Sequence, residues 1–536
     1  MRAVIGWQEA WRWMAVVSLL CLGKAAAAAT VDDLMRQRLQ PQLESPVPAA
    51  MSAATLPQNV AQFYAGRHWK PLWDDRQLGK LLAQIADLYS DGLSPDDYNL
   101  SLLEKYRREK SADPQIVVDR EVLATQSYLL ALLHLYHGKV NPVQLDANWN
   151  FDARQLNAAE ILPLLRQGVE NDRINQVFAQ ARPKPQQYNI TRAALARLRG
   201  IAMEGGWPQI PEGPVLKPGM SDVRVPVLRQ RLEIAGLVSY AVPAQPELYA
   251  DDLVAAVKRF QGEAYLDGDG VIGRGTLQVL NIPVAERIAQ MRANLERMRW
   301  FMSDLKTDFV MVDLAGYRIS YLQGNQVKWS SKVQIGKAYR SSPVFKSSIN
   351  YITLSPGWVM PPTIFKEDAL PAIKKNPDYL KKNHLSVHDA AGNPVALETV
   401  DWEKPGNITL RQEPGPKAAL GDVVIRFPNP FSIYLHDTPH KEHFADSQRA
   451  TSSGCIRVEN IQELATLLLN DPVKWSDAEV KKVIDARKTR NVTLKSKVPI
   501  MLVYWTVDVG DDGYVSFKPD VYERDKVVVT ALDEKA

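Results

Sequence analysis

From Val31 to about Gly205 the chain carries apolar residues at helical spacing. The clearest helix is predicted over 121–136, a nearly continuous apolar stretch that ends at Gly138, a residue type that often follows the last turn of a helix. An aromatic cluster upstream, over 63–73, is interpreted as packing between helices. The first part of the chain is therefore predicted to be a helical domain.

A Pro-containing boundary over 207–214 precedes a compact unit between Leu216 and Asn281. Apolar spacing predicts two helices in this unit, over 227–235 and 254–260. The run Asp-Gly-Asp-Gly (267–270) predicts a turn. A calcium loop is the alternative, but the further acidic positions and the closing glutamate of an EF-hand are missing.

Residues 284–302 predict a helical connector with one apolar stripe, which we expect to pack against another element. The stripe consists of Ile288, Met291, Leu295 and Met298. Beyond Asp308 the pattern changes to alternating runs of β-branched and aromatic residues, which is typical of strands. The predicted strands cover 309–314, 317–323, 326–335, 350–354, 422–427, 431–436 and 498–506. These runs predict one β-rich domain.

The interval 361–421 interrupts these strands with Pro-, Lys- and Gly-rich sequence. It is too long for an ordinary loop, so we interpret it as an inserted cap over a site. A disordered segment is the alternative. Tyr379, Trp402 and a helical pattern over 364–373 argue against disorder.

The chain of 536 residues is long enough for several domains, and its 46% hydrophobic content can supply each with a core. The net charge is only +4 and no basic block is present, so we expect no nucleic-acid partner. Residues 1–29 have the pattern of a secretory signal, which predicts a soluble exported protein. An uncleaved anchor is the alternative, but Lys24 interrupts a segment that would need roughly 20 apolar residues.

The candidate chemistry centres on Cys455, in the motif Ser-Ser-Gly-Cys-Ile-Arg-Val (452–458). The other cysteine, Cys21, lies in the leader, so Cys455 is a lone thiol in an oxidising compartment, which favours a reactive role. His436 precedes it at the end of a predicted strand. A nearby imidazole accepts the thiol proton and can lower a cysteine pKa from about 8.5 to roughly 3.5–7.5. These residues indicate a cysteine nucleophile with His436 as its base.

Further candidate site residues surround this pair. Gly454 has no Cβ, so the backbone N–H groups of Gly454 and Cys455 can approach a developing oxyanion. Arg457 offers a cation for a substrate carboxylate, with a structural ion pair to Glu459 or Asp437 as an equal alternative.

Three more positions are candidates for substrate binding. Tyr434 is expected on the same face as His436, because side chains along a strand repeat every second residue. Trp358 is expected to form a wall for the substrate, although core packing competes for both aromatic residues. Ser453, between the serine and glycine of the motif, is the remaining candidate.

The histidines near this site leave a metal centre open as an alternative. His436, Asp437, His440 and His443 have a spacing that zinc ligands can have. No further cysteine completes such a site, and the last two histidines lie in a charged segment. We therefore expect neither a metal nor another cofactor.

The ordered pair of His436 and Ser-x-Gly-Cys (452–455) resembles the catalytic signature of L,D-transpeptidases. Many members have histidine where this chain has Ser453, which removes one candidate base and leaves His436. The unit 216–281, with Val-Lys-Arg-Phe-Gln (257–261), resembles the three-helix peptidoglycan-binding domain. The order of domains is similar to that of the large Gram-negative periplasmic members.

The resemblance implies an α+β multidomain protein. Its expected parts are a signal peptide (1–29), a helical scaffold domain (30–210), a peptidoglycan-binding domain (211–283), a helical connector (284–306) and a β-rich L,D-transpeptidase catalytic domain (307–536) with the cap inserted at about 361–421.

The resemblance also implies the reaction. A cysteine acyl-enzyme would form on tetrapeptide stems of peptidoglycan with release of D-alanine, and a second stem would resolve it as a 3→3 cross-link. Peptidoglycan is the expected partner, other wall-synthesis enzymes are candidate partners, and a carbapenem is expected to inhibit covalently. Two alternatives remain, an L,D-carboxypeptidase or endopeptidase that hydrolyses the same stems, and a wall-binding scaffold without activity.

Overall fold

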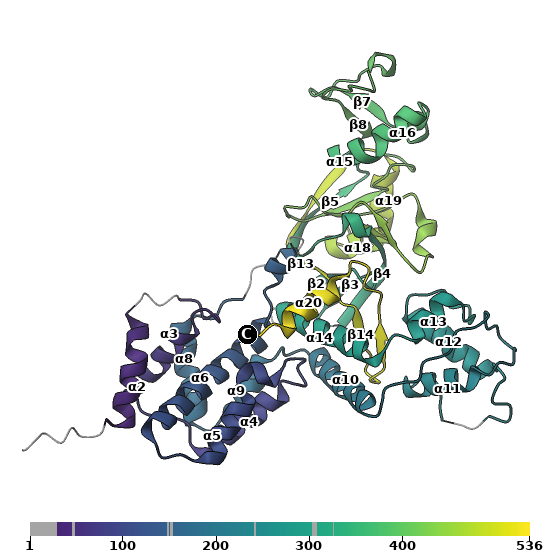
Figure 1. Ribbon diagram of the computed structural model, residues 1–536. Coiled ribbons are helices and arrows are strands. Elements are labelled where there is room, and N and C mark those ends of the chain that lie inside the picture. Colours follow the sequence, from purple (N-terminus) through teal and green to yellow (C-terminus); the bar gives the residue numbers. More distant parts are fainter. Residues whose placement is uncertain are drawn as a thin grey trace, which may run out of the picture.

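The computed structural model describes residues 29–44, 49–146, 149–150, 154–240, 243–302, 308–324 and 326–535. Three parts are visible in Figure 1: a helical region at one end, a small helical unit at the other, and a β-rich part between and above them. The predicted signal peptide lies outside the described residues, except for Ala29. No helix in the described part of the chain combines the length and apolarity needed to cross a membrane.

The helical region confirms the predicted helical character of the N-terminal part. It contains α2 (Val31–Leu39), α3 (Leu56–Ala65), α4 (Asp75–Asp87), α5 (Leu100–Glu109), α6 (Pro114–His137), α7 (Pro142–Leu145), α8 (Ala158–Glu170), α9 (Ile174–Ala181) and α10 (Gln186–Met203), with short 3₁₀ turns at Gln40–Leu43 and Pro95–Tyr98. The predicted helix over 121–136 covers about the last two thirds of α6, which starts earlier because Asp113 caps its first turn and Pro114 occupies the first helical position. It ends at His137, and Gly138 follows as the C-cap, as expected.

A buried glutamate explains how the aromatic cluster packs. Glu121 on α6 is fully buried, and its carboxylate accepts hydrogen bonds from the backbone N–H groups of Leu72 (2.7 Å) and Trp73 (3.1 Å) and from the Tyr64 hydroxyl (2.9 Å). The predicted packing role of this cluster is confirmed.

The small unit contains α11 (Val225–Ile234), α12 (Asp251–Glu263) and α13 (Arg274–Leu280) around its own apolar core. The two predicted helices are confirmed, and both begin earlier than predicted. The run 267–270 is a turn, in which the Gly270 N–H donates to the Gln261 side chain at 2.8 Å.

The predicted connector is α14 (Val284–Phe301), and its apolar stripe packs as expected: Met291, Leu295 and Met298 are buried, and Ile288 packs against the same core. Almost every residue from Gln290 to Phe301 is buried, on all sides of the helix. Its buried charged residues have partners: Arg299 pairs with Glu296 on the same helix and donates to the carbonyl of Asp91, which is far away in sequence, at 2.8 Å. Because α14 contacts α6, α10, β14 and α20, it is a central helix that joins the helical region to the β-rich part.

The main sheet closes on itself. Its path runs β5, β13, β2, β3, β4, β12, β10, β9, and β9 pairs again with β5. The bounds are β2 (Phe309–Asp313), β3 (Arg318–Gln323), β4 (Gln326–Gly336), β5 (Val344–Leu354), β9 (Val423–Arg426), β10 (Leu435–His436), β12 (Ile456–Val458) and β13 (Arg490–Val503), with β1 (Trp149–Asn150) added beside β5 and β11 (Ala450–Ser452) beside β4. A separate hairpin consists of β14 (Val507–Val509) and β15 (Val515–Phe517).

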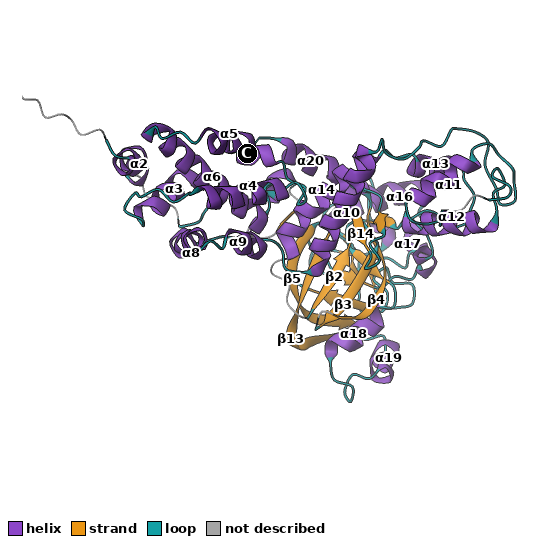
Figure 2. Cartoon of the chain, turned by 90° about the horizontal axis from the view of Figure 1, so that it is seen from below, coloured by secondary structure: helices purple, strands orange, loops and turns teal. Residues whose placement is uncertain are grey.

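Helices cover two sides of this sheet, as Figure 2 shows. On one side lie α10, α14 and α20 (Arg524–Asp533), and on the other lie α18 (Ile461–Leu469) and α19 (Asp477–Asp485). Together with the helical region and the small unit, this arrangement confirms the predicted α+β multidomain fold class.

Most predicted strands are confirmed, but the strand over 431–436 is shortened to its last two residues. The preceding residues form a loop that Asn429 organises: its side-chain oxygen accepts from the N–H groups of Phe431 (3.1 Å) and Ile433 (2.9 Å). An asparagine that satisfies nearby backbone groups competes with strand pairing, which explains the difference.

The interval between β5 and β9 is ordered and has a small apolar core of its own, so the disordered alternative was wrong. It contains β6 (Trp358–Val359), β7 (Ser386–His388), β8 (Thr409–Gln412), α15 (Pro362–Ile364), a π-helical turn (Phe365–Ala369), α16 (Leu370–Lys375), α17 (Tyr379–Lys382) and a 3₁₀ turn (Leu397–Thr399). We call residues 361–421 the cap segment; it forms the outermost part of the β-rich region in Figure 1. That it closes over substrate stays a prediction.

Candidate active site

Two neighbouring strands of the closed sheet position the candidate residues. β10 and β12 run parallel, with Leu435 opposite Ile456 and His436 opposite Arg457. Because side chains alternate along strands, Arg457 and Cys455 share the face of His436. The sheet therefore places on one face the histidine and the cysteine that the sequence proposed as a pair.

The His436 imidazole is buried, and its orientation is fixed by a hydrogen bond. Nδ1 lies 2.5 Å from the Asp437 carbonyl oxygen. Since a carbonyl only accepts, the ring proton is on Nδ1 and the lone pair is on Nε2. Burial, with the nearby Arg457 charge as the second cause, lowers the His436 pKa to about 3. The imidazole is thus neutral and can accept a proton at neutral pH.

The Cys455 thiol is half-buried, and its Sγ lies 3.8 Å from the Ser432 carbonyl oxygen. Burial raises the Cys455 pKa, although hydrogen bonds from Tyr434 and the charges of Arg426 and Arg457 act in the opposite direction. The expectation that the imidazole lowers this pKa does not hold for the free protein, because a buried neutral histidine supplies no positive charge. The resting pair is a neutral thiol and a neutral imidazole.

The turn before Cys455 depends on a glycine. Gly454 has φ +114°, a conformation that side chains with a Cβ rarely adopt. Its carbonyl accepts from the Ser342 hydroxyl at 2.7 Å, and the same hydroxyl accepts from the Gly336 N–H at 3.0 Å. The end of β4 therefore holds the cysteine turn in place.

The two candidate oxyanion donors differ in this structure. The Gly454 N–H already donates to the Ser452 hydroxyl at 3.1 Å. The Cys455 N–H makes no hydrogen bond with any described residue. Of the two, the Cys455 N–H is the one available to a ligand.

Arg457 has a neutral partner rather than a carboxylate. Its Nη1 donates to the Gln334 side chain at 3.2 Å, and its buried Nε has no hydrogen-bond partner among the described residues. Within the described part of the chain it forms no ion pair with Asp437 or Glu459, the alternative that the sequence left open, and Asp437 instead pairs with Lys441. A guanidinium next to Cys455 is thus left without a counter-charge.

Tyr434 lies next to Cys455 and interacts with Trp358. The Tyr434 ring packs edge-on against the His436 ring, with centroids 5.6 Å apart, and Arg426 lies over its face at 4.9 Å. Burial and the adjacent Cys455 raise the Tyr434 pKa. Trp358 is half-buried and packs against the core of the cap segment. Both aromatic residues adjoin the site, and both also contribute to packing.

Ser453 connects the cysteine turn to the cap segment through an arginine. The Arg340 guanidinium donates to the Ser453 hydroxyl (3.1 Å) and to the carboxylates of Asp368 (2.6 Å) and Glu367 (2.6 Å) in the π-helical turn. Arg340, in the 3₁₀ turn Ala338–Arg340 that follows β4, thereby links the turn before Cys455 to the cap segment.

The other two histidines of the metal alternative point to different partners. His440 contacts the Glu442 carboxylate at 3.2 Å and His443 contacts Asp446 at 3.0 Å, both at exposed positions. Within the described residues, no three histidine, cysteine or carboxylate side chains gather as a metal site would require.

Comparisons with known proteins identify the β-rich part. A family profile described as "L,D-transpeptidase catalytic domain" matches residues 307–500. Residues 307–500 are an L,D-transpeptidase catalytic domain. A "Scaffold domain" profile matches 58–195, and a "Putative peptidoglycan binding domain" profile matches 221–280.

One curated relative and one solved structure accompany these matches. A protein of Haemophilus influenzae named "Putative L,D-transpeptidase" is 32% identical over 271 residues, which are 49% of this chain and 54% of that protein. The chain thus spans about half the length of this relative. A crystal structure of the L,D-transpeptidase from Xylanimonas cellulosilytica is 14% identical, covering 55% of this chain and 99% of that one. Its TM-score of 0.18 is too low to bear on the fold.

Several residues around the candidate site at Cys455 were not found from the sequence. They are Arg340, Ser342, Gln334, Arg426 and Tyr522, whose hydroxyl donates to the Gly336 carbonyl at 2.8 Å. Each comes from a strand or loop distant in sequence, so spacing alone gave no signal. The cluster Lys-Ala-Tyr-Arg-Ser-Ser (337–342) directly after a predicted strand was the one visible hint.

Proposed function

We propose that this chain is a peptidoglycan L,D-transpeptidase that forms 3→3 cross-links through an acyl-enzyme on Cys455. The observation that carries the proposal is the shared face of His436 and Cys455 on paired strands of the L,D-transpeptidase catalytic domain. The peptidoglycan-binding domain supports the same polymer as substrate. A periplasmic location follows from this substrate.

In the first half-reaction, Cys455 Sγ attacks the carbonyl carbon of diaminopimelate in a tetrapeptide stem. The thiol proton passes to His436 Nε2 as the S–C bond forms, because the neutral pair does not ionise beforehand. The Cys455 N–H donates to the oxyanion. The intermediate then collapses, the C–N bond to D-alanine breaks, and the imidazolium returns the proton to the departing amine.

In the second half-reaction, the side-chain amine of diaminopimelate on another stem attacks the thioester. His436 takes the proton of that amine, and the sulfur leaves and is reprotonated. The cap segment, with Trp358 and Tyr434, shields the thioester from water, which favours transfer over hydrolysis. Arg457 binds a carboxylate of the stem.

The decisive experiment is mass spectrometry of purified disaccharide tetrapeptides after incubation with the protein. Cross-linked dimers and free D-alanine are expected from the wild type, and neither from Cys455→Ala. Trimmed monomers alone would identify a hydrolase of the same bond. An unchanged substrate would favour a wall-binding scaffold, and labelling by a carbapenem on wild type but not on Cys455→Ala would argue against that reading.

A further inference from the structure

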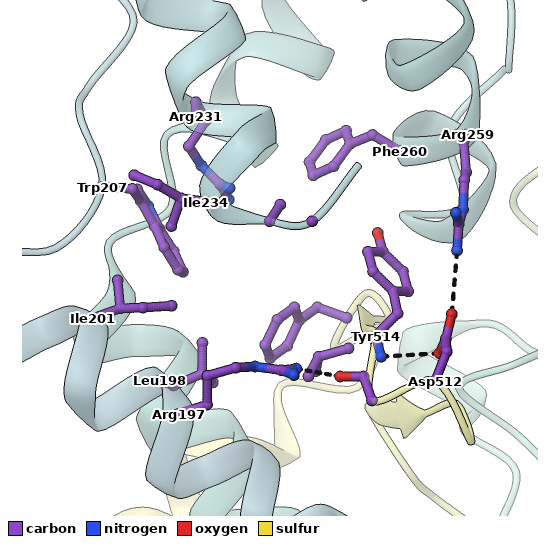
Figure 3. A pocket seen from close by; sticks show the side chains of 15 residues that line it. Arg197, Leu198, Ile201, Trp207, Arg231, Ile234, Arg259, Phe260, Asp512 and Tyr514 are labelled. Carbon is purple, nitrogen blue, oxygen red and sulfur yellow. Dashed lines mark hydrogen bonds and ion pairs between the residues drawn. The ribbon is translucent and has the colours of Figure 1, made fainter. Parts of the chain in front are cut away.

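A cavity of about 250 Å³ lies where three parts of the chain meet (Figure 3). They are α10 of the helical region, α11 and α12 of the peptidoglycan-binding unit, and the turn between β14 and β15. The cavity is both basic and aromatic: its lining includes Arg197, Arg231 and Arg259 and the rings of Trp207, Phe260, Tyr514 and Phe517. It shares no lining residue with the site around Cys455.

Arg231 is the buried cation of this cavity. It is only 5% exposed, and its guanidinium lies over the Trp207 ring at 4.1 Å and points into the cavity (Figure 3). Its Nε donates to the Leu280 carbonyl at 3.0 Å. The two terminal nitrogens bind no described residue, and no described carboxylate lies within ion-pair distance of them. A buried charge without a counter-charge is costly, so a guanidinium whose neighbours here are only a carbonyl and a ring indicates a site for an anion.

A second buried arginine strengthens this charge. Arg287 on α14 lies over the Phe517 ring at 4.5 Å, and among the described residues its one side-chain acceptor is the neutral Gln290, at 2.8 Å. Burial, followed by the charge of Arg231, lowers the Arg287 pKa to about 10, so both groups remain cationic at neutral pH. Two like charges are therefore held close together without an ion-paired carboxylate among the described residues.

The acids nearby are already engaged with another cation. Glu263 and Asp512 lie 3.8 and 3.9 Å from Arg259, which is half exposed at the rim. The Asp512 carboxylate also accepts from the Tyr514 N–H at 3.0 Å. These two acids compensate Arg259 and leave the charge of Arg231 to a ligand.

We propose that this cavity binds a carboxylate of the peptidoglycan strand, with an apolar part of the same strand against Trp207 and Tyr514. A guanidinium matches a carboxylate in shape and charge, and aromatic walls suit the apolar part of such a ligand. The site anchors the wall polymer at the junction of the binding unit and the catalytic domain. This inference rests on the proposed function in one respect, the identification of the bound polymer as peptidoglycan.

The test measures binding without catalysis. Full-length Cys455→Ala is titrated by calorimetry with a purified disaccharide tetrapeptide, and with the same fragment after its carboxylates are amidated. Arg231→Gln in that background is expected to weaken binding roughly tenfold or more, since it removes the charged hydrogen-bond donor. Lys217→Gln is the matched control, because Lys217 is an exposed cation of the same unit outside the cavity.

A second variant guards against misfolding of the first. Tyr514→Ser removes a cavity wall on the β14–β15 turn without touching α11 and is expected to weaken binding several-fold. Equal affinity of the original and amidated fragments, together with unchanged binding by Tyr514→Ser, would overturn the proposal. So would inorganic phosphate that displaces the fragment at a similar concentration, because it would reveal a general anion site. Failure of the proposed function would be detected in a separate measurement, in which wild-type protein incubated with tetrapeptide stems would show no acyl adduct on Cys455.

Discussion

At the scale of single residues, the neutral state of His436 and Cys455 sets the chemistry. The hydrogen bond from Nδ1 to the Asp437 carbonyl fixes one tautomer, and burial disfavours the charged form of both side chains. A cysteine beside a permanent imidazolium would instead be a thiolate near neutral pH. The two cases differ in how alkylation depends on pH.

We therefore predict that alkylation of Cys455 by iodoacetamide accelerates about tenfold for each pH unit between pH 6 and 9. The reason is that the raised Cys455 pKa keeps the thiolate a small fraction over this range, and the fraction grows with pH. Rates are measured by intact mass, with Cys455→Ala as the unlabelled control. A rate that levels off near pH 7 would show a preformed thiolate instead.

Arg457 affects His436 through its charge. It is the second cause of the lowered His436 pKa, and its Nε has no hydrogen-bond partner among the described residues. A substrate carboxylate bound to Arg457 would offset this charge and make His436 a stronger base once substrate is present.

Replacement of Arg457 by Gln is accordingly predicted to raise the His436 pKa in the free protein, while it lowers kcat/KM by roughly tenfold or more. NMR titration of the His436 ring measures the first effect and turnover of tetrapeptide stems the second. Arg318→Gln is a control, because Arg318 is exposed on β3 and bonds the Ser330 hydroxyl. An unchanged His436 pKa in Arg457→Gln would mean that burial alone sets it.

At the scale of elements, the cap segment is joined to the cysteine turn by Arg340. Its guanidinium bonds Asp368 and Glu367 on the π-helical turn and also bonds Ser453, which precedes Gly454. The carboxylates are 44% and 54% exposed, so the ion pairs contribute little to global stability. Their effect is on where the cap segment sits.

We expect Arg340→Ala to increase hydrogen exchange over 362–375 and to lower kcat/KM several-fold, with a melting temperature close to that of the wild type. The reason is that the contact fixes position more than it stabilises the fold. Lys374→Ala is the matched control, because Lys374 pairs with Glu403 inside the cap segment and away from the turn. If exchange in this region stayed at the wild-type level, Arg340 would not hold the cap segment.

The elements also show what sequence patterns could and could not predict. A nearly continuous apolar stretch located α6, an apolar stripe located α14, and alternating runs of β-branched and aromatic residues located most strands. The strand over 431–436 failed because Asn429 bonds the backbone of the following residues, a local effect that the apolar pattern does not record. The motif around Cys455 predicted the pair of Cys455 and His436. The roles of Arg340 and Ser342 could be recognised only in the structure, where the closed sheet places them near Cys455.

At the scale of the whole molecule, buried charged groups join parts that are far apart in sequence. On α14, Glu296 accepts from the Val140 N–H at 2.7 Å and pairs with Arg299, which also bonds the Tyr188 hydroxyl at 2.9 Å. From its sequence such a helix looks amphipathic, because its charged side chains would be expected to face solvent. Their partners exist only once the helical region and the sheet have assembled, so the central place of α14 could not be predicted from its own residues.

Buried histidines in two parts of the molecule make its stability sensitive to acid. Burial lowers the pKa of His134 and His137 on α6 below the usual 6.5, and that of His436 to about 3. The unfolded chain takes up protons on these rings below about pH 6.5 while the folded chain does not, so their stabilising contribution is present above pH 6.5 and is lost as the pH falls toward 3. Each such proton changes the free energy of unfolding by about 1.4 kcal/mol per pH unit.

His134 gives the cleanest test, because it lies far from Cys455 in sequence and its Nδ1 bonds the Tyr98 hydroxyl at 3.0 Å. We predict that the fall in melting temperature between pH 7 and pH 5 is smaller in His134→Gln than in the wild type, since one acid-sensitive proton site is removed from the unfolded chain. Circular dichroism melts measure it, and exposed His384→Gln is the control that should match the wild type. An equal fall in all three proteins would show that carboxylates, rather than buried imidazoles, dominate the acid response.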